Sequence, residues 1–195
     1  MQQTLLEAIA ARYSCRNFLP ARSVSPDELR LLLEAGRLAP SAFGLEPWRF
    51  ISVVDDARRK AVAQACFDQP AVSTAAALIV IVALVEELDP DSDYVRARFE
   101  AEARGQDTAP IYSAYRAMHA AETVAAWAVG QCNFAASHIL LQATHLRLAS
   151  CPIGGFDAPA LAAALSLPRG EAPALVIALG HCADAAPLRL RKPLE

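Results

Sequence analysis

Two arginine-rich segments near opposite ends of the chain have the residue types that bind small anions. Near the start stands Arg12-Tyr13-Ser14-Cys15-Arg16, which places two guanidinium groups and a hydroxyl directly after a predicted helix. The last seven residues, RLRKPLE, hold Arg189, Arg191 and Lys192. Because guanidinium groups form paired, charge-assisted hydrogen bonds with phosphate, the two segments together suit a small anion site. Scattered, solvated charge is the alternative interpretation.

Two loops between predicted elements are also candidates for ligand contact. Residues 39–48, APSAFGLEPW, leave a helix, cross a loop between two prolines and enter a strand through Trp48. In residues 152–157, PIGGFD, successive glycines let backbone N–H groups come close to a flat heterocycle. A plain helix–strand connector and an ordinary turn are the simpler interpretations, and we expect Trp48 in the core.

These four segments, taken in order, resemble the motifs of the flavin nitroreductase family, and the resemblance spans essentially the whole chain. That family typically shows Arg-x-Ser-x-Arg/Lys, Pro-Ser-x-x-Asn-x-Gln-Pro-Trp, Pro-Ile-x-Gly-Phe and a C-terminal Lys/Arg-x-Arg. Here the motifs read RYSCR, PSAFGLEPW, PIGGFD and RLRKP. Two positions depart from the pattern, because Gly44 stands where the family often has asparagine and Glu46 where it often has glutamine.

The resemblance implies a bound FMN. Arg12, Arg189 and Arg191 would bind its phosphate, whereas Lys192 would be solvated. Arg16 would lie at the flavin pyrimidine edge and stabilise the reduced anion. The full set of candidate cofactor-binding residues is Arg12, Tyr13, Ser14, Arg16, Pro40, Ser41, Ala42, Gly44, Asp68, Pro152, Ile153, Gly154, Gly155, Arg189 and Arg191.

Within that set, the resemblance gives each segment a role. Ser14 would contact the ribityl or phosphate region, and the backbone amides of Gly154 and Gly155 would lie near flavin N5 and O4. Pro40, Ser41 and the loop after them would come from a partner subunit. No side chain is expected as a catalytic acid, base or nucleophile, because flavin N5 carries the hydride.

The implied activity is an FMN-dependent oxidoreductase that takes hydride from NADH or NADPH. In a ping-pong cycle it would then reduce nitroaromatics, quinones or similar flat electron-poor acceptors. Three alternatives stay open: a flavin enzyme acting on an enone, a pteridine, a halogenated phenol or a flavin; a flavin-binding protein without turnover; and a helical interaction protein without flavin.

Composition excludes several classes of partner. The formal net charge of −3 argues against nucleic acid. The longest clean apolar run, residues 75–85, is about half of the ~20 residues that a membrane-spanning helix needs. No secretory signal is visible at the start, so we expect a cytoplasmic protein without a membrane partner.

The cysteines and histidines suggest no metal site. Five scattered cysteines, Cys15, Cys66, Cys132, Cys151 and Cys182, contain no Cys-x-x-Cys pair and form an odd total. We therefore expect small buried thiols in a reducing compartment and no disulfide framework.

Periodicity predicts helices separated by strands within a single domain, residues 1–195. The helices are expected at 4–13, 26–38, 56–67, 94–104 and 158–165, and the strands at 48–54, 78–85 and 172–179. Loops are expected at 107–112 and 152–155. This pattern indicates an α+β or α/β sandwich. The resemblance adds a central, mostly antiparallel sheet flanked by helices.

Residues 119–148 form the longest periodic segment. As one helix they would reach ~45 Å and need a second subunit to bury them; two helices broken near Gly130 are the alternative. The expected homodimer would bury this helix and receive the C-terminal tail of each partner. A helical excursion at about 86–118, with Tyr94, Phe99, Tyr112 and Tyr115, is expected to cover the site and set selectivity.

Overall fold

The computed structural model describes residues 4–121 and 124–194. Its centre is a four-stranded sheet in the order β1-β2-β4-β3, and every neighbouring pair is antiparallel. The strands are β1 (Trp48–Val53), β2 (Ala77–Leu84), β3 (Ala149–Ile153) and β4 (Glu171–Gly180). Every residue of β2 is buried, because both faces of this apolar strand are covered.

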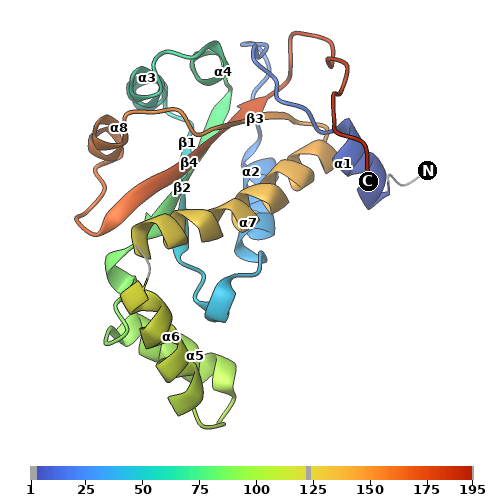
Figure 1. Cartoon of the computed structure of the whole chain (residues 1–195). Helices are drawn as coiled ribbons and strands as arrows, with labels where there is room; N and C mark the ends of the chain where they lie inside the picture. Colours follow the sequence, from blue (N-terminus) through green and yellow to red (C-terminus); the bar gives the residue numbers. More distant parts are fainter. Residues whose placement is uncertain (1–3, 122–123, 195) are drawn as a thin grey trace.

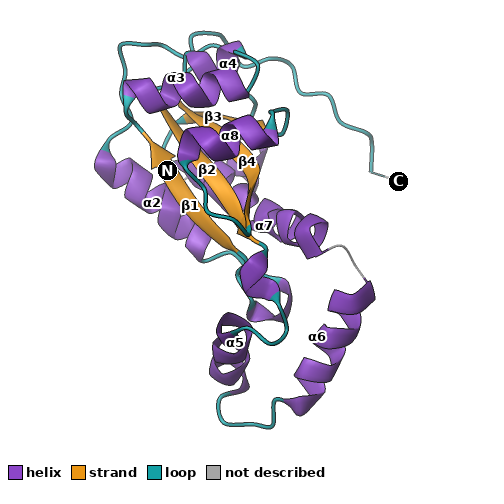
Figure 2. Ribbon diagram, turned by 90° about the vertical axis from the view of Figure 1, so that its left-hand side faces the viewer, coloured by secondary structure: helices purple, strands orange, loops and turns teal. Residues whose placement is uncertain are grey.

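Helices cover the two faces of the sheet, as Figure 2 shows. On one side lie α1 (Leu5–Ala11), α2 (Pro26–Arg37) and α7 (Val124–His145), and on the other α3 (Asp56–Ala65), α4 (Pro70–Ser73) and α8 (Ala158–Leu165). Alternate residues of β2 point into the two layers, with Ile79 and Ile81 in one hydrophobic cluster and Leu78 and Val80 in the other. The α+β sandwich is confirmed.

Local capping explains why several helices begin where the sequence predicts. Ser25 accepts a hydrogen bond from the Glu28 backbone, and the Glu28 carboxylate accepts one from the Ser25 backbone in return. Thr4 and Glu7 form the same box at the start of α1. Each box satisfies backbone N–H groups that the first turn of a helix leaves free.

The predicted excursion consists of η2 (Glu86–Leu88), α5 (Asp93–Ala103) and α6 (Ala109–Ala121), and Figure 1 shows α5 and α6 side by side, away from the sheet. The prediction of a loop at 107–112 is wrong for residues 109–112, because α6 begins at Ala109. Pro110 lies in the first turn of α6, where its missing N–H is not needed. Phe99 and Tyr115 are fully buried, and the Tyr115 hydroxyl donates to the Leu88 carbonyl at 2.6 Å.

The long helix differs from the prediction at its N-terminal end. The structure has α6 to Ala121 and α7 from Val124, and the predicted stretch at 122–123 lies outside the described residues. The alternative break near Gly130 is wrong, because α7 continues through this residue to His145. A Cβ at Gly130 would meet no atom within 4 Å, so the position carries only the small propensity cost of glycine.

Pro152 and Ile153 belong to β3, so the prediction of a loop from residue 152 is wrong by two residues. β3 is an edge strand, and a proline is tolerated there because its missing N–H removes no essential ladder bond. A bend follows the strand and leads into α8, which occupies the predicted residues.

The cysteine prediction is corrected for one pair. Cys15 and Cys182 form a disulfide with a Cα–Cα distance of 5.7 Å. Their separation of 167 residues gives no spacing signal in the sequence. Cys66, Cys132 and Cys151 are buried free thiols, as expected.

The tail after His181 has no helix or strand, and Figure 2 shows it extending away from the sheet toward the C-terminus. Arg189 Nη2 donates to the carbonyl oxygen of Ile9 at 3.2 Å and to that of Arg12. The tail of the described chain thus contacts the segment that follows α1 in the same chain.

Candidate functional site

The two arginine-rich segments of the sequence converge on one cavity of about 490 Å³. Residues 10–16 form one side of it and the tail forms the other. The lining residues predicted from the sequence are Arg12, Tyr13, Ser14, Arg16, Arg189 and Arg191. Segments that are 177 residues apart are therefore brought together, as the Arg189–Arg12 contact shows.

The environment of Arg12 indicates an anion-binding site. Burial lowers the pKa of the Arg12 guanidinium, and the positive charges of Arg189 and Arg191 lower it further. Arg12 Nη1 is buried and has no hydrogen-bond partner. A buried, unpaired donor among like charges is unfavourable, so these residues fit a bound phosphate.

The 12–16 segment lies against the first half of β3. Ser14 forms a parallel bridge with Ser150, and the Cys15 N–H donates to the Ser150 carbonyl at 3.0 Å. From Ser150 the strand continues to Ile153, a span of about 10 Å at 3.3 Å per residue, and Gly154 follows directly. The arginine cavity and the glycine loop therefore lie toward the two ends of one strand.

Gly154 and Gly155 leave space that the chain does not fill. A Cβ at Gly154 would lie 4.0 Å from Leu175 Cδ1, and one at Gly155 would lie 3.8 Å from Gln69 Nε2. Neither packing nor a left-handed backbone requires glycine at these positions. The open surface leaves room for a flat ligand beside the loop.

Gln69, which no sequence motif predicted, holds the glycine loop. Its Nε2 donates to the Gly155 carbonyl at 2.8 Å and to the Cys66 carbonyl at 3.0 Å. Its neighbour Asp68, a predicted site residue, lies elsewhere, in a cavity of about 300 Å³ with Arg59 and Lys60. The only sequence signal for Gln69 was its place beside Asp68.

The Pro40–Gly44 segment lies far from the arginine cavity of the same chain. The Ala42 N–H donates to Gln131 Oε1 at 2.9 Å, near the start of α7. Arg12 instead lines a cavity with Thr144, near the end of α7. Thr144 follows Gln131 by thirteen positions of the helix, which corresponds to about 20 Å.

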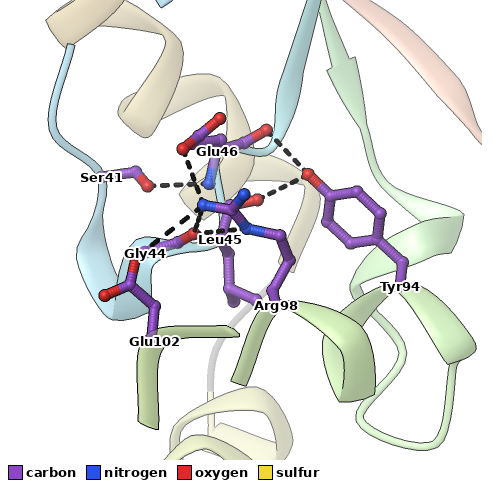
Figure 3. A network of polar contacts seen from close by, with 7 residues as sticks. All are labelled: Ser41, Gly44, Leu45, Glu46, Tyr94, Arg98 and Glu102. Carbon is purple, nitrogen blue, oxygen red and sulfur yellow. Dashed lines mark hydrogen bonds and ion pairs between the residues drawn. The ribbon is translucent and has the colours of Figure 1, made fainter. Parts of the chain in front are cut away.

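Residues of α5 bind the loop that contains Gly44. Arg98 donates to the Gly44 carbonyl and forms an ion pair with Glu46, and the Tyr94 hydroxyl donates to the Leu45 carbonyl (Figure 3). Neither Tyr94 nor Arg98 was predicted to hold this loop. Their i, i+4 spacing and the acidic Glu46 are the sequence signals that agree with the contact.

The chain belongs to the nitroreductase family. The sequence model described as "Nitroreductase family" matches residues 9–181. An NADH dehydrogenase of Thermus thermophilus is 35% identical over 168 residues, which cover 86% of this chain and 82% of the relative. An oxygen-insensitive NADPH nitroreductase of Helicobacter acinonychis is 29% identical and covers 98% of this chain and 94% of its own length.

Solved structures share the fold. A nitroreductase-like protein from Streptococcus mutans has a TM-score of 0.84 at 21% identity, with coverage of 96% of this chain and 93% of the other. A protein from Exiguobacterium sibiricum, crystallised in complex with FMN, has a TM-score of 0.81 at 23% identity, with coverage of 98% and 94%.

Proposed function

We propose that this protein is an FMN-dependent oxidoreductase that takes hydride from NADH or NADPH and passes it to a flat, electron-poor acceptor such as a nitroaromatic or a quinone. The observation that carries the proposal is the unpartnered Arg12 Nη1, buried beside Arg189 and Arg191. The strand that begins beside this cationic cavity ends at an open glycine loop. A ligand with a phosphate at one end and a flat ring at the other matches both.

The residues present would hold FMN as follows. Arg12, Arg189 and Arg191 bind the phosphate, and Ser14 contacts the ribityl chain. Arg16 lies by the pyrimidine edge, where its charge stabilises the reduced flavin anion. The backbone N–H groups of Gly154 and Gly155 orient the ring, and FMN supplies the hydride-transfer chemistry.

Relatives support the cofactor and the co-substrate. The Helicobacter acinonychis relative is an NADPH nitroreductase, the Thermus thermophilus relative is an NADH dehydrogenase, and the Exiguobacterium sibiricum protein binds FMN in its crystal structure. The names of the relatives include both NADH and NADPH, so both nucleotides are proposed as hydride donors for this chain.

The working unit is a homodimer in which each loop around Pro40 faces the FMN of the other subunit. Apolar side chains without partners support this assembly: Leu5 and Leu6 on α1 are 68% and 74% exposed, and Phe134 on α7 is 50% exposed. The separation of about 20 Å along α7 keeps the loop from the phosphate site of its own chain. Arg189 contacts its own subunit, and we propose that in the dimer the residues after Arg191 extend onto the partner subunit.

α7 meets the length and hydropathy expected of a membrane-spanning helix, the single such helix in residues 4–121 and 124–194. We assign it to the core and the dimer interface, because Ala128, Cys132 and Ile139 are buried against the sheet layer. The protein is cytoplasmic and acts on small molecules, with neither nucleic acid nor membrane as partner. In that compartment thiol reductants would act on Cys15–Cys182.

Purification with added FMN, followed by gel filtration, tests the proposal. The expected product is a yellow dimer with one FMN per chain, whose flavin absorbance bleaches when NADH or NADPH is mixed in anaerobically and recovers when a quinone is added. A colourless protein that gains no FMN on titration contradicts the proposal. So does an FMN-bound protein that neither nucleotide reduces near neutral pH.

A further inference from the structure

One face of α5 is directed at the loop of residues 41–46. Tyr94, Arg98 and Glu102 are spaced i, i+4 and i+8, so their side chains leave the helix on the same side. Figure 3 shows all three pointing at the loop. The adjacent residues Val95 and Phe99 face the core instead and are fully buried.

Three consecutive carbonyl groups of the loop are bound by two of these side chains. Arg98 Nε donates to the Gly44 oxygen at 2.8 Å, and Arg98 Nη2 reaches both this oxygen and Glu46 Oε1, the latter at 2.6 Å. The Tyr94 hydroxyl lies 2.7 Å from the Leu45 oxygen and 3.0 Å from the Glu46 oxygen. The backbone of the loop is thereby fixed from α5.

The loop needs such external restraint. Phe43 and Glu46 adopt positive φ values of 59° and 43°, which cost about 1–2 kcal/mol each for residues with a side chain. Three local bonds support the turn: the Glu46 N–H donates to Ser41 Oγ at 2.7 Å, and the N–H groups of Gly44 and Leu45 donate to the backbone oxygens three residues earlier at 3.2 and 3.3 Å. Contacts from outside the loop must offset the remaining cost.

The two residues that depart from the family motif, Gly44 and Glu46, both take part in the contact between α5 and the loop. Gly44 has a φ of 63°, and a Cβ there would lie 2.8 Å from Glu102 Cγ. A larger residue at this position would require Glu102 to move away. Glu46 supplies the negative charge that pairs with Arg98. Gly44, Glu46, Arg98 and Glu102 thus form one complementary set.

The contact is partly shielded from water. The side chains of Arg98 and Glu46 are 27% and 38% exposed, so their ion pair is screened less than a fully exposed one. Burial raises the pKa of Tyr94 to about 12. Tyr94 therefore keeps its proton at neutral pH and remains a hydrogen-bond donor to the loop.

We propose that Arg98 and Tyr94 are positioning residues, which set the shape of loop 41–46 and thereby the recognition of the electron acceptor. This inference rests on the proposed function, which places the loop beside the FMN of the partner subunit. The helix α5 then influences which electron acceptor binds, because its side chains fix the backbone of loop 41–46. Its own aromatic core residues, Phe99 among them, need no contact with substrate.

The test compares the FMN-bound wild type with Arg98→Met, Arg98→Lys and Tyr94→Phe, using NADH and 1,4-benzoquinone. Arg98→Met is expected to raise the KM for the quinone about 10-fold or more, with a smaller change in kcat, because displacement of about 1 Å near a reacting centre is costly. The visible absorption band of the bound flavin should shift as well. Arg98→Lys should recover part of the loss, since it keeps the charge but not the planar fork.

Arg96→Met is the matched control, because Arg96 lies on the same helix and pairs with the exposed Asp93. It should leave both KM and the flavin spectrum at wild-type values. Glu46→Gln, combined with Arg98→Met, should raise KM by less than the product of the single effects, since both changes remove one interaction. The inference is overturned if Arg98→Met keeps the wild-type KM and flavin spectrum. It is also overturned if Arg96→Met raises KM by the same factor as Arg98→Met.

The proposed function fails by a different outcome. A wild-type protein that binds no FMN, or that binds FMN without reduction by NADH or NADPH, overturns the proposed function and with it this inference. A yellow, active wild type whose Arg98 variants keep wild-type KM and flavin spectrum overturns only the positioning role.

Discussion

The guanidinium group of Arg12 combines partial burial, two cationic neighbours and one unpaired nitrogen. Without a bound anion, this arrangement destabilises the folded chain. Binding of an anion removes the penalty, so affinity for phosphate and instability of the empty site have the same cause. Site residues often reduce stability for this reason.

Arg12→Gln should therefore stabilise the protein freed of FMN, by roughly 0.5–1 kcal/mol, while it weakens FMN binding at least about 10-fold. Urea unfolding in a phosphate-free buffer measures the first effect, and fluorescence titration with FMN measures the second. Arg30→Gln, at an exposed position on α2, is the control and should change neither quantity. A less stable Arg12→Gln protein with unchanged FMN affinity contradicts the assignment.

At the scale of elements, the glycine loop depends on a side chain from the turn between α3 and α4. Gln69 bonds the Gly155 carbonyl, and the Asp157 N–H donates to the Ala65 carbonyl at 2.8 Å. The loop is therefore fastened on both sides of Phe156. The backbone N–H groups that would face the flavin owe their direction to these contacts.

Gln69→Leu should raise the dissociation constant for FMN about 10-fold and lower the free energy of unfolding by about 1–2 kcal/mol, because the Gly155 carbonyl loses its side-chain donor and the Cys66 carbonyl keeps only a backbone donor. Gln69→Glu should raise the dissociation constant and lower the free energy of unfolding further, because it places a carboxylate against two carbonyl oxygens. Gln64→Leu, on the exposed side of α3, serves as the control. FMN titrations of the four proteins provide the comparison, and equal dissociation constants for Gln69→Leu and the wild type refute the positioning role.

The elements that the sequence predicted are those with local signals. The Ser25–Glu28 capping box, the apolar run of β2 and the helix after Asp157 all depend on residues a few positions apart. The start of α6 was missed because Pro110 indicates a loop unless its place in a first turn is known. β3 was missed because Pro152 and the glycines after it are typical of a turn.

The site was predictable only where the family motifs mark it. The convergence of Arg12, Arg189 and Arg191 on one cavity is observed, whereas their binding of FMN stays a prediction. Gln69 and Arg98 were not predicted, because each binds a backbone carbonyl far away in the chain, and every residue type carries the same carbonyl group.

At the scale of the whole molecule, the disulfide joins the arginine segment to the root of the tail. Cys15 lies between Ser14 and Arg16, and Cys182 is the first residue of the tail. Hydrogen bonds support the same junction, from the Leu19 N–H to the His181 carbonyl at 2.8 Å and from the Ala183 N–H to the Asn17 carbonyl at 2.9 Å. The covalent bond and the hydrogen bonds hold both halves of the arginine cavity together.

Reduction with dithiothreitol, or Cys182→Ser, should lower the free energy of unfolding by about 2–4 kcal/mol, because the cross-link restricts the unfolded chain. The affinity for FMN should also fall, but by a smaller factor than the folding equilibrium constant, because the hydrogen bonds at the junction remain. Denaturant unfolding of the oxidised and reduced wild type measures the difference. Dithiothreitol should have no further effect on Cys182→Ser, and identical unfolding midpoints for the oxidised and reduced wild type exclude the cross-link.

The fastening at Cys182 also limits where the last thirteen residues can travel. Arg189 follows Cys182 by seven positions, so a fully extended tail places Arg189 no farther than about 25 Å from Cys182. A short tether of this kind confers an effective concentration in the millimolar range on the group it carries. Within that radius Arg189 stays near the proposed phosphate site, whether the tail lies on its own subunit or on the partner of the proposed dimer.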